Sequence, residues 1–323
     1  MKVTCLVIQT ALAAIAGLLL VGGVQAQGFP THPITIVNPS SAGSSSDSLS
    51  RYVSQSINAQ TKEAVIVENK AGANGVIGVE AVLNAPADGH TLIFTTSSSV
   101  VFNKYLIKAL PHDPAKELVP VGFIAQGAMM LAVNPKLQFN TVQDVVAYAK
   151  KNPMKLNFGY ATGTQQLAGA MFQQLGGAKI TFVGYKTNSA MLMAVVNGEV
   201  DLAISDPAGF VPFMKNGQVR VVGVTSEKRL SAYPDVPTFL ESNVDFKLDP
   251  WYGLLAKRGT DPQTLARLTE LLKTAATTPQ IQAYLKANAL EPIFQPSAEA
   301  SARVAEEVKR WDGLAKAAGV EPQ

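Results

Sequence analysis

The sequence predicts an α/β protein made of two units, in each of which strands alternate with helices. Short apolar runs of strand length alternate with longer helical patterns along most of the chain. The loops that follow the strands are rich in glycine, serine and threonine, as is usual where open α/β sheets bind ligands. The 323 residues, 47% of them hydrophobic, are enough for two domains of ordinary size.

The N-terminus has the features of a secretory signal peptide. Lys2 provides the positive charge, and residues 11–21 (ALAAIAGLLLV) form the apolar segment. Val24 and Ala26 are small enough for the −3 and −1 positions, so we expect cleavage after Ala26 and a mature protein in the periplasm. The alternative is an uncleaved anchor over residues 5–24, but no basic stop-transfer flank follows the apolar run.

Composition excludes several classes of function. Cys5 is the only cysteine and lies in the segment expected to be removed, so we expect no disulfide, cysteine zinc site or thiol catalysis. The formal net charge of +3 is too small to indicate nucleic-acid binding. His32, His90 and His112 are the only histidines and are far apart in turns and loops, so we expect no metal site and no Ser/His/Asp triad.

The first unit opens with a short strand and a loop of Pro, Ser, Gly and Ala. This loop has no charge before Asp47, which is a good N-cap for the next helix. Turn signals at residues 72–75 and 86–89 separate the later elements. Strands are expected at 34–37, 64–68 and 91–95, in a parallel sheet, and helices at 48–58 and 76–84.

A second unit of the same kind runs from about residue 125 to 245, and Thr141 caps its first helix. A strand then returns at 251–256, and three helices follow at 261–277, 279–287 and 297–317. Within and just before the second unit, strands are expected at 119–123, 131–133, 156–160, 180–183, 200–204 and 219–224, and helices at 142–151, 165–175 and 189–197.

Two loops at strand ends are candidate anion sites. Residues 38–47 precede a helix N-terminus, where backbone N–H groups favour an anion. This segment lacks the Gly-Lys-Ser/Thr of a P-loop and the G-x-G-x-x-G of a dinucleotide fold. Residues 159–164 (GYATGT) form a similar loop, whose central Ala161 cannot act as a nucleophile. A plain connection is the alternative for both loops.

Asp206, which is followed by Pro207, has two interpretations. The sequence favours a helix N-cap or Asx turn. A side chain that points into a cleft would instead bind a ligand amine or hydroxyl. Trp251 and Tyr252 are expected in the core, with a cleft wall as their alternative.

Taken together, these segments resemble the Bug/TctC family, the periplasmic solute receptors of tripartite tricarboxylate transporters. The resemblance covers essentially the whole mature chain. It is strongest in FPTHPITIVNPSSAGSSSDSLSR, VIVENKAGANGVIGVEAV and PADGHTLIF, and it continues through KLNFGYATGTQQLAGAMFQ, NGEVDLAISD, VRVVGVTSEKRLSAYPDVPTF and WYGLLAKRGTD.

The resemblance implies a type II periplasmic-binding-protein (Venus-flytrap) fold, in which a two-stranded hinge joins two α/β domains. The expected division is a signal peptide at 1–26, a discontinuous first domain at 27–124 and 249–323, and a second domain at 125–248. Hinge crossings are expected near 123–130 and 247–251. The implied protein is a monomer that binds without catalysis or cofactor.

The implied ligand is a small organic carboxylate: a dicarboxylate, an amino acid or an aromatic acid. Membrane permease subunits of the transporter would receive it. Neutral donors of the first domain would hold one carboxylate, and the second domain would hold the far end. The predicted ligand-binding residues are Pro39, Ser40, Ser41, Gly43, Ser44, Ser46, Thr96, Ser97, Gly163, Thr164, Gln165, Tyr185, Ser205 and Asp206.

The chain departs from the family pattern close to these residues. It has Gly-Ser at 43–44 where relatives have two glycines, and Gln-Leu at 166–167 where they have His-Leu. It has Gly-Tyr-Lys-Thr at 184–187 in place of Pro-Tyr-Lys-Gly, and Ser-Asp at 205–206 in place of Asp-Asn. The ligand of a particular relative therefore does not transfer to this chain.

Two other functions stay open. One is a periplasmic ligand sensor for a two-component system, which the sequence does not distinguish from a transport receptor. The other is an exported α/β hydrolase or isomerase, against which the lack of a His or Cys constellation argues.

Overall fold

The computed structural model describes residues 28–317. The predicted signal peptide, Cys5 and the cleavage position after Ala26 lie outside this range. His32 is the first residue of the compact unit that contains the helices and strands described below. No helix within residues 28–317 is both long enough and apolar enough to cross a bilayer.

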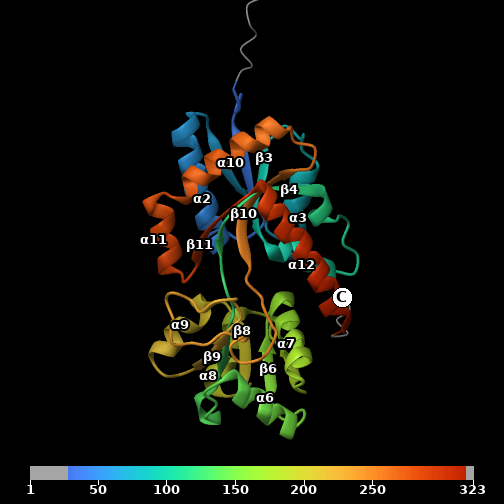
Figure 1. Cartoon of the computed structure of the whole chain (residues 1–323), viewed down its shortest axis with the longest axis vertical. Coiled ribbons are helices and arrows are strands. Elements are labelled where there is room, and N and C mark those ends of the chain that lie inside the picture. The colour runs from blue at the N-terminus through green and yellow to red at the C-terminus, as the bar shows by residue number, and fades with distance from the viewer. Residues whose placement is uncertain (1–27, 318–323) are drawn as a thin grey trace, which may run out of the picture. The chain divides into compact units, whose positions relative to one another are not determined.

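Six strands form the first sheet, in the order β11-β4-β10-β3-β1-β2 (Figure 1). β1 pairs in parallel with β2 and β3, as predicted. β10 lies antiparallel between β3 and β4, and β11 is an antiparallel edge strand. The parallel pairing predicted for the first three strands is therefore confirmed, but β10, β4 and β11 make the whole sheet mixed. The strands are β1 (Ile34–Asn38), β2 (Val65–Asn69), β3 (Thr91–Thr96), β4 (Leu118–Gln126), β10 (Trp251–Lys257) and β11 (Glu291–Pro296).

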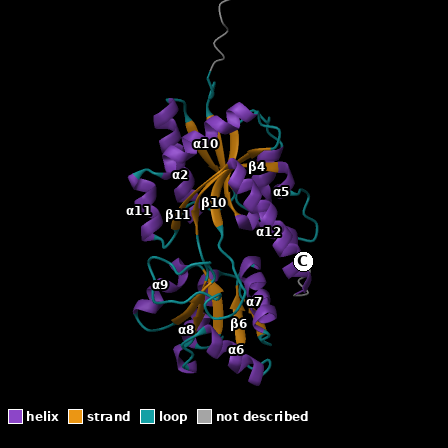
Figure 2. Ribbon diagram, in the orientation of Figure 1, coloured by secondary structure: helices purple, strands orange, loops and turns teal. Residues whose placement is uncertain are grey.

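Helices pack against this sheet from segments far apart in the chain (Figure 2). α2 contacts β1, β2 and β3, and it also packs against α10 and α11. α12 contacts β4 and β11, while α3 contacts β1 and β3. These elements are α2 (Ser45–Thr61), η1 (Ala73–Gly75), α3 (Val76–Leu83), η2 (Ser98–Phe102), α4 (Asn103–Leu106), α5 (Pro114–Glu117), α10 (Pro262–Ala276), α11 (Pro279–Ala287) and α12 (Ser297–Ala317).

The second sheet has five strands in the order β7-β6-β8-β5-β9. β6 is parallel to β7 and β8, and β5 is antiparallel to both β8 and β9. Its elements are β5 (Met130–Val133), η3 (Pro135–Leu137), α6 (Val142–Lys151), β6 (Asn157–Tyr160), α7 (Gly163–Gly176), β7 (Thr181–Gly184), α8 (Asn188–Asn197), β8 (Leu202–Ser205), α9 (Pro207–Lys215) and β9 (Arg220–Val224).

Threonine caps mark the start of three helices of the second sheet, α6, α7 and α8, and the first two have a full capping box. Thr141 Oγ1 accepts from the N–H of Asp144 at 3.1 Å, and the Asp144 carboxylate accepts from the N–H of Thr141 at 2.9 Å. Thr162 and Gln165 make the same exchange at the start of α7. Such capping boxes satisfy N–H groups that have no partner within the helix. The predicted bounds of α6 are confirmed, and α7 begins two residues earlier than predicted.

The N-cap predicted for α2 is wrong. Ser44 is the cap, since its Oγ accepts from the N–H of Asp47 at 3.2 Å. Asp47 lies in the first turn instead. Because serine occupies three consecutive positions here, the sequence offers several caps of similar strength.

Two segments cross between the sheets, one after β4 and one before β10. The N–H of Gly127 donates to the carbonyl of Pro250 at 2.7 Å. Thr225 Oγ1 accepts from the N–H of Met129 at 2.8 Å and donates to the carbonyl of Leu248 at 2.5 Å. The two crossings are therefore tied side by side. The domain boundaries and a hinge at this position stay predictions.

A hollow of about 440 Å³, named here the Arg303 hollow, lies beside the crossings and is lined mostly by charged side chains. Arg303 Nη2 donates to the Asp249 carboxylate at 3.1 Å, and its Nε donates to Glu307 at 3.0 Å. Trp251 Nε1 also donates to Glu307 at 3.0 Å. Burial raises the pKa of the Asp249 and Glu307 carboxyls, and the Arg303 guanidinium opposes that rise.

Candidate functional site

A cleft of about 530 Å³ opens at the carboxyl ends of four strands. The loops after β1 and β3 form one wall, and the residues that follow β6 and β8 contribute to the other. Ligands bind in this position in open α/β sheets, because the loops there can vary while the strands hold them in place.

The loop after β1 and the first turn of α2 form a wall of hydroxyl groups. Ser45 and Ser46 are the first two residues of α2, and N–H groups at such positions have no acceptor within their own helix. The helix dipole also favours a negative group there. From this segment the cleft is lined by Pro39, Ser40, Ser41, Ser44, Ser45 and Ser46.

Asn38, the last residue of β1, makes side-chain hydrogen bonds to this loop. Its side chain is fully buried. The Oδ1 atom accepts from the N–H of Ser40 at 2.8 Å, and Nδ2 donates to the hydroxyl of Ser46 at 3.1 Å. These two hydrogen bonds connect the end of β1 to both ends of the loop.

Asp47 holds the same loop from the helix side. Its carboxylate accepts from the N–H of Gly43 at 2.9 Å, from Arg51 Nε at 3.2 Å and from Asn69 Nδ2 at 2.8 Å. Burial by itself would raise the pKa of Asp47, but the hydrogen bonds from these three residues outweigh it and hold the pKa below its ordinary value. Gly43 has a φ of +81°, which a side chain would strain.

The loop after β3 meets the turn before α3 in the same wall. Thr96, Ser98 and Ser99 line the cleft beside Asn74 and Gly75. A Cβ on Gly75 would lie 2.5 Å from Ser99 Oγ, and the φ of Gly75 is +91°, so only glycine fits there. The close approach of these two loops depends on that glycine.

Gln165 organises the opposite wall. Its Oε1 accepts from the N–H groups of Ala161 and Thr162, at 2.8 and 3.2 Å. Its Nε2 donates to Asn188 Oδ1 at 2.8 Å and to Ser205 Oγ at 3.0 Å. The amide group therefore has all four of its hydrogen-bonding positions filled by protein partners. This arrangement is suited to positioning the loop around Gly163 and Thr164.

Asp206 is the residue just before α9 and lines the cleft. It occupies the N-cap position but makes no capping hydrogen bond with its side chain, so the preferred interpretation as a side-chain cap is wrong. The Asp206 side chain is exposed in the cleft. The protein around it partly desolvates the carboxylate, and this desolvation raises its pKa. Tyr252 lines the same cleft, and burial followed by the charge of Asp206 raises the pKa of its phenol.

Asp206 is the only formally charged side chain among the described residues that line the cleft. No lysine, arginine or histidine lines it in this part of the chain. An anion would therefore be held by neutral dipoles alone, and a cation would meet one carboxylate.

The cleft brings together most of the residues predicted to bind the ligand. Whether any of them contacts a ligand stays a prediction. Those that line it are Pro39, Ser40, Ser41, Ser44, Ser46, Thr96, Gly163, Thr164, Gln165 and Asp206.

Four predicted residues do not line the cleft. Ser97 and Ser205 are buried, with 1% and 0% of their surface exposed. Gly43 shapes the serine loop through its N–H bond to Asp47. Tyr185 packs against the apolar core of the second sheet.

Several lining residues were not among those predicted. Asn74 was assigned only to a turn, although it falls within one of the segments that carry the family resemblance. Asn103, Asn188 and Pro250 come from elements whose positions beside the cleft depend on the tertiary fold. The alternative interpretation of Tyr252 as a cleft wall is correct.

Comparison with known proteins gives consistent matches. A family model described as "Tripartite tricarboxylate transporter family receptor" matches residues 49–320. Protein BugT of Bordetella pertussis is 28% identical over 300 residues, which cover 92% of each chain.

Solved structures resemble the chain over most of its length. An R. palustris protein solved with adipate has a TM-score of 0.76 and 28% identity, covering 92% of this chain and 100% of that one. MatC from Rhodopseudomonas palustris, solved with bound malate, has a TM-score of 0.73 and covers 89% of this chain and 100% of that one. At 24% identity it supports the fold alone. The predicted fold class is confirmed.

Proposed function

Because the chain belongs to the family of tripartite tricarboxylate transporter receptors, we propose that it is a periplasmic solute-binding protein that captures a small organic carboxylate in the cleft. The proposal includes export by the predicted signal peptide and delivery of the ligand to the permease subunits of such a transporter. The observation that carries it is a cleft wall of hydroxyl groups and helix N-terminal N–H groups, with no cationic side chain among the described lining residues. The relative solved with adipate supports a carboxylate ligand.

Neutral donors suit a receptor that must release its ligand. Several oriented N–H and O–H dipoles can hold a carboxylate without a buried counter-charge. They also avoid the desolvation of a buried ion pair, which is often as large as the attraction gained. We assign one carboxylate of the ligand to the serine wall around Ser45 and Ser46.

Asp206 sets the chemistry of the other end of the ligand. A second carboxylate there would meet an unbalanced negative charge, whereas an ammonium or hydroxyl group could donate to it. Within the predicted ligand classes, this favours an amino acid over a plain dicarboxylate, and a carboxylate that carries a hydroxyl group would also suit Asp206. Closure would follow if the ligand binds the closed form better than the open one.

The proposal is tested by calorimetry on the mature chain with matched carboxylates: glutarate, glutamate, adipate and malate. A true ligand at a hundredfold excess over its Kd should also stabilise the fold by about 2.7 kcal/mol. Thr164→Val removes a cleft hydroxyl and should weaken binding about tenfold, while Thr274→Val makes the same change on the exposed side of α10 and should not.

Two outcomes would count against the proposal. One is that no carboxylate in a wider panel binds. The other is that a bound compound is steadily turned over, which would favour the hydrolase or isomerase alternative.

A further inference from the structure

The structure brings two of the three histidines together at the end of the first sheet that is remote from the cleft. His32 precedes β1, and His90 precedes β3 at the end of an Asp-Gly-His turn. Thr35 pairs with Thr91 in the parallel register, so the residues just before the two strands lie side by side. The cleft is at the carboxyl ends of the same strands.

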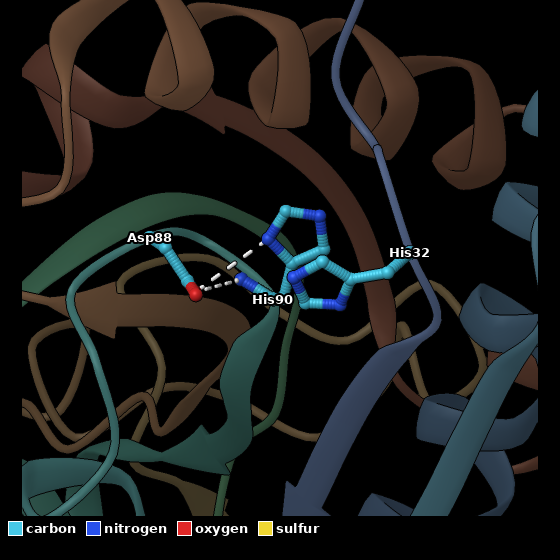
Figure 3. A group of neighbouring side chains, drawn as sticks. All are labelled: His32, Asp88 and His90. Carbon is cyan, nitrogen blue, oxygen red and sulfur yellow. Dashed lines mark hydrogen bonds and ion pairs between the residues drawn. The ribbon is translucent and has the colours of Figure 1, made fainter.

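Asp88 completes the group. The rings of His32 and His90 stack with their centroids 3.6 Å apart and their planes 18° from parallel, and the Asp88 carboxylate faces the His90 ring (Figure 3). His90 Nδ1 and Asp88 Oδ1 are 3.5 Å apart. One ligand atom from each of the three residues lies within 4.8 Å of the other two.

We propose that His32, Asp88 and His90 form a binding site for a divalent transition metal, with zinc as the natural test ion. Two imidazoles and one carboxylate are a donor set that zinc uses, with water in the fourth position. Ligand atoms about 2.0–2.1 Å from one tetrahedral ion are roughly 3.4 Å from one another. The Asp88–His90 pair already has this spacing.

His32 must move for the site to close. Nearly parallel rings cannot both direct a lone pair at one ion, so binding turns the His32 ring out of the stack. His32 is exposed and lies before the first strand, so this rotation disturbs no core packing. The site is therefore half formed: the Asp88-Gly89-His90 turn is fixed, and His32 supplies the adjustable ligand.

The surroundings also favour ligation. His32 Nδ1 lies 3.3 Å from the carbonyl of Pro33, so a neutral ring that donates there leaves Nε2 as the ligand atom. Asp88 Oδ1 accepts from the N–H of His90 at 2.9 Å, which fixes the carboxylate. Burial, followed by the nearby His32, lowers the pKa of His90.

Sequence spacing alone predicted no metal site, because the two histidines are 58 positions apart in the chain. The parallel pairing of β1 and β3 brings them together. The proposal is independent of the carboxylate cleft, so either can fail without the other.

The test is zinc binding to the mature chain, with any affinity tag removed, measured by calorimetry and by the visible absorption of cobalt as a substitute. We expect one ion per chain and a melting temperature that rises with zinc. His32→Phe keeps a ring to stack on His90 but has no ligand nitrogen. Asp88→Asn keeps an oxygen for the His90 N–H but removes the charge. Each should weaken zinc at least tenfold.

His112→Gln is the matched control. His112 lies near Glu80 and Glu117, at 3.9 and 3.6 Å, and its replacement should leave the zinc affinity unchanged. Absence of zinc binding would overturn the proposal. So would an affinity that survives both His32→Phe and Asp88→Asn, or one that is lost in His112→Gln.

Discussion

The cleft and the Arg303 hollow are of similar size but treat charge in opposite ways. In the Arg303 hollow, the carboxylates of Asp249 and Glu307 are paired with one guanidinium, and Lys247 lies 3.6 Å from Asp249. In the cleft, the carboxylate of Asp206 has no cationic neighbour among the described lining residues. Desolvation by the protein is the main cause that raises the pKa of all three carboxyl groups, those of Asp206, Asp249 and Glu307.

We interpret the paired carboxylates of Asp249 and Glu307 as structural, and the unpaired carboxylate of Asp206 as part of the proposed binding site. Charges that are balanced within the fold join elements together, and Arg303 links α12 to β4, β11 and the segment before β10. A charge left unbalanced in a cleft is expected to lower the stability of the protein, and under the proposed function the ligand would offset this cost. The following predictions test that distinction.

The largest effect is expected from Arg303→Met. Removing the guanidinium leaves Glu307 without a counter-charge and leaves Asp249 with Lys247 alone, although the Asp249 and Glu307 side chains are only 9% and 16% exposed. We expect the free energy of unfolding to fall by about 3–5 kcal/mol, measured by urea denaturation. Arg310→Met, in the same hollow, should change it by only about 0.5 kcal/mol. Equal effects of the two variants would refute the assignment.

The second largest loss of stability is expected from Asp47→Asn, because the Asp47 carboxylate is paired with Arg51 behind the cleft wall. We expect a loss of about 2 kcal/mol at pH 7, since the hydrogen bonds to a charged group are weakened. The pKa of Asp47 is lowered in the folded state, so its stabilisation is present above the unfolded pKa of about 3.9 and is lost as pH falls through the folded pKa.

Denaturation of this variant at a series of pH values checks the sign. The difference from the parent protein should close in acid, and exposed Asp245→Asn should show no such trend. A gap that widens in acid would contradict the proposed pairing.

Asp206→Asn should change ligand preference. If the carboxylate binds an ammonium group, its loss should weaken glutamate by about tenfold or more, since a hydrogen bond to a charged group contributes about 1.5–3 kcal/mol. Glutarate and adipate should bind unchanged or more tightly. Calorimetry with the glutamate and glutarate pair measures the effect, and a parallel change in both would exclude Asp206 from this role.

The smallest effect is expected from Asp206→Asn on the stability of the ligand-free protein. The pKa of Asp206 is raised on folding, so the charge lowers stability once pH exceeds the unfolded pKa of about 3.9, and it has no effect below that pH. Because Asp206 is exposed and solvent screens its charge, Asp206→Asn should stabilise the ligand-free protein at pH 7 by only about 0.5 kcal/mol. Thermal melting at pH 7 and pH 3 would show the gain and its disappearance. A loss at pH 7 would mean that the carboxylate has a structural partner.

Elements with strong local signals could be predicted from the sequence. Thr141 with Asp144 specifies the start of α6, and the bounds of α11 and α12 also agree with the prediction. β11 was missed because Pro292 and Pro296 argue against a strand. It is an edge strand, where proline is tolerated because one side of the ladder stays unpaired.

The cleft was predictable where the loops themselves carried the signal. Ser40, Thr96 and Thr164 follow strands whose carboxyl ends meet, so their placement followed from the fold class. The burial of Ser97 could not be predicted, because its neighbours Thr96 and Ser98 line the cleft and the sequence does not show which of these hydroxyl groups points inward. The position of Asn188 could not be predicted, because it depends on how α8 packs against β6, β8 and α9.

The central position of β10 has a consequence for the order of folding. β3 and β4 pair with each other only through β10, which ends at Lys257. The second sheet, in contrast, uses only strands between Met130 and Val224. If the chain is exported N-terminus first, as proposed, the second sheet can be completed before the first, because all of its strands precede β10. We expect the first sheet to stay open at its centre until β10 arrives, and the edges of β3 and β4 that face each other to stay unpaired during that interval.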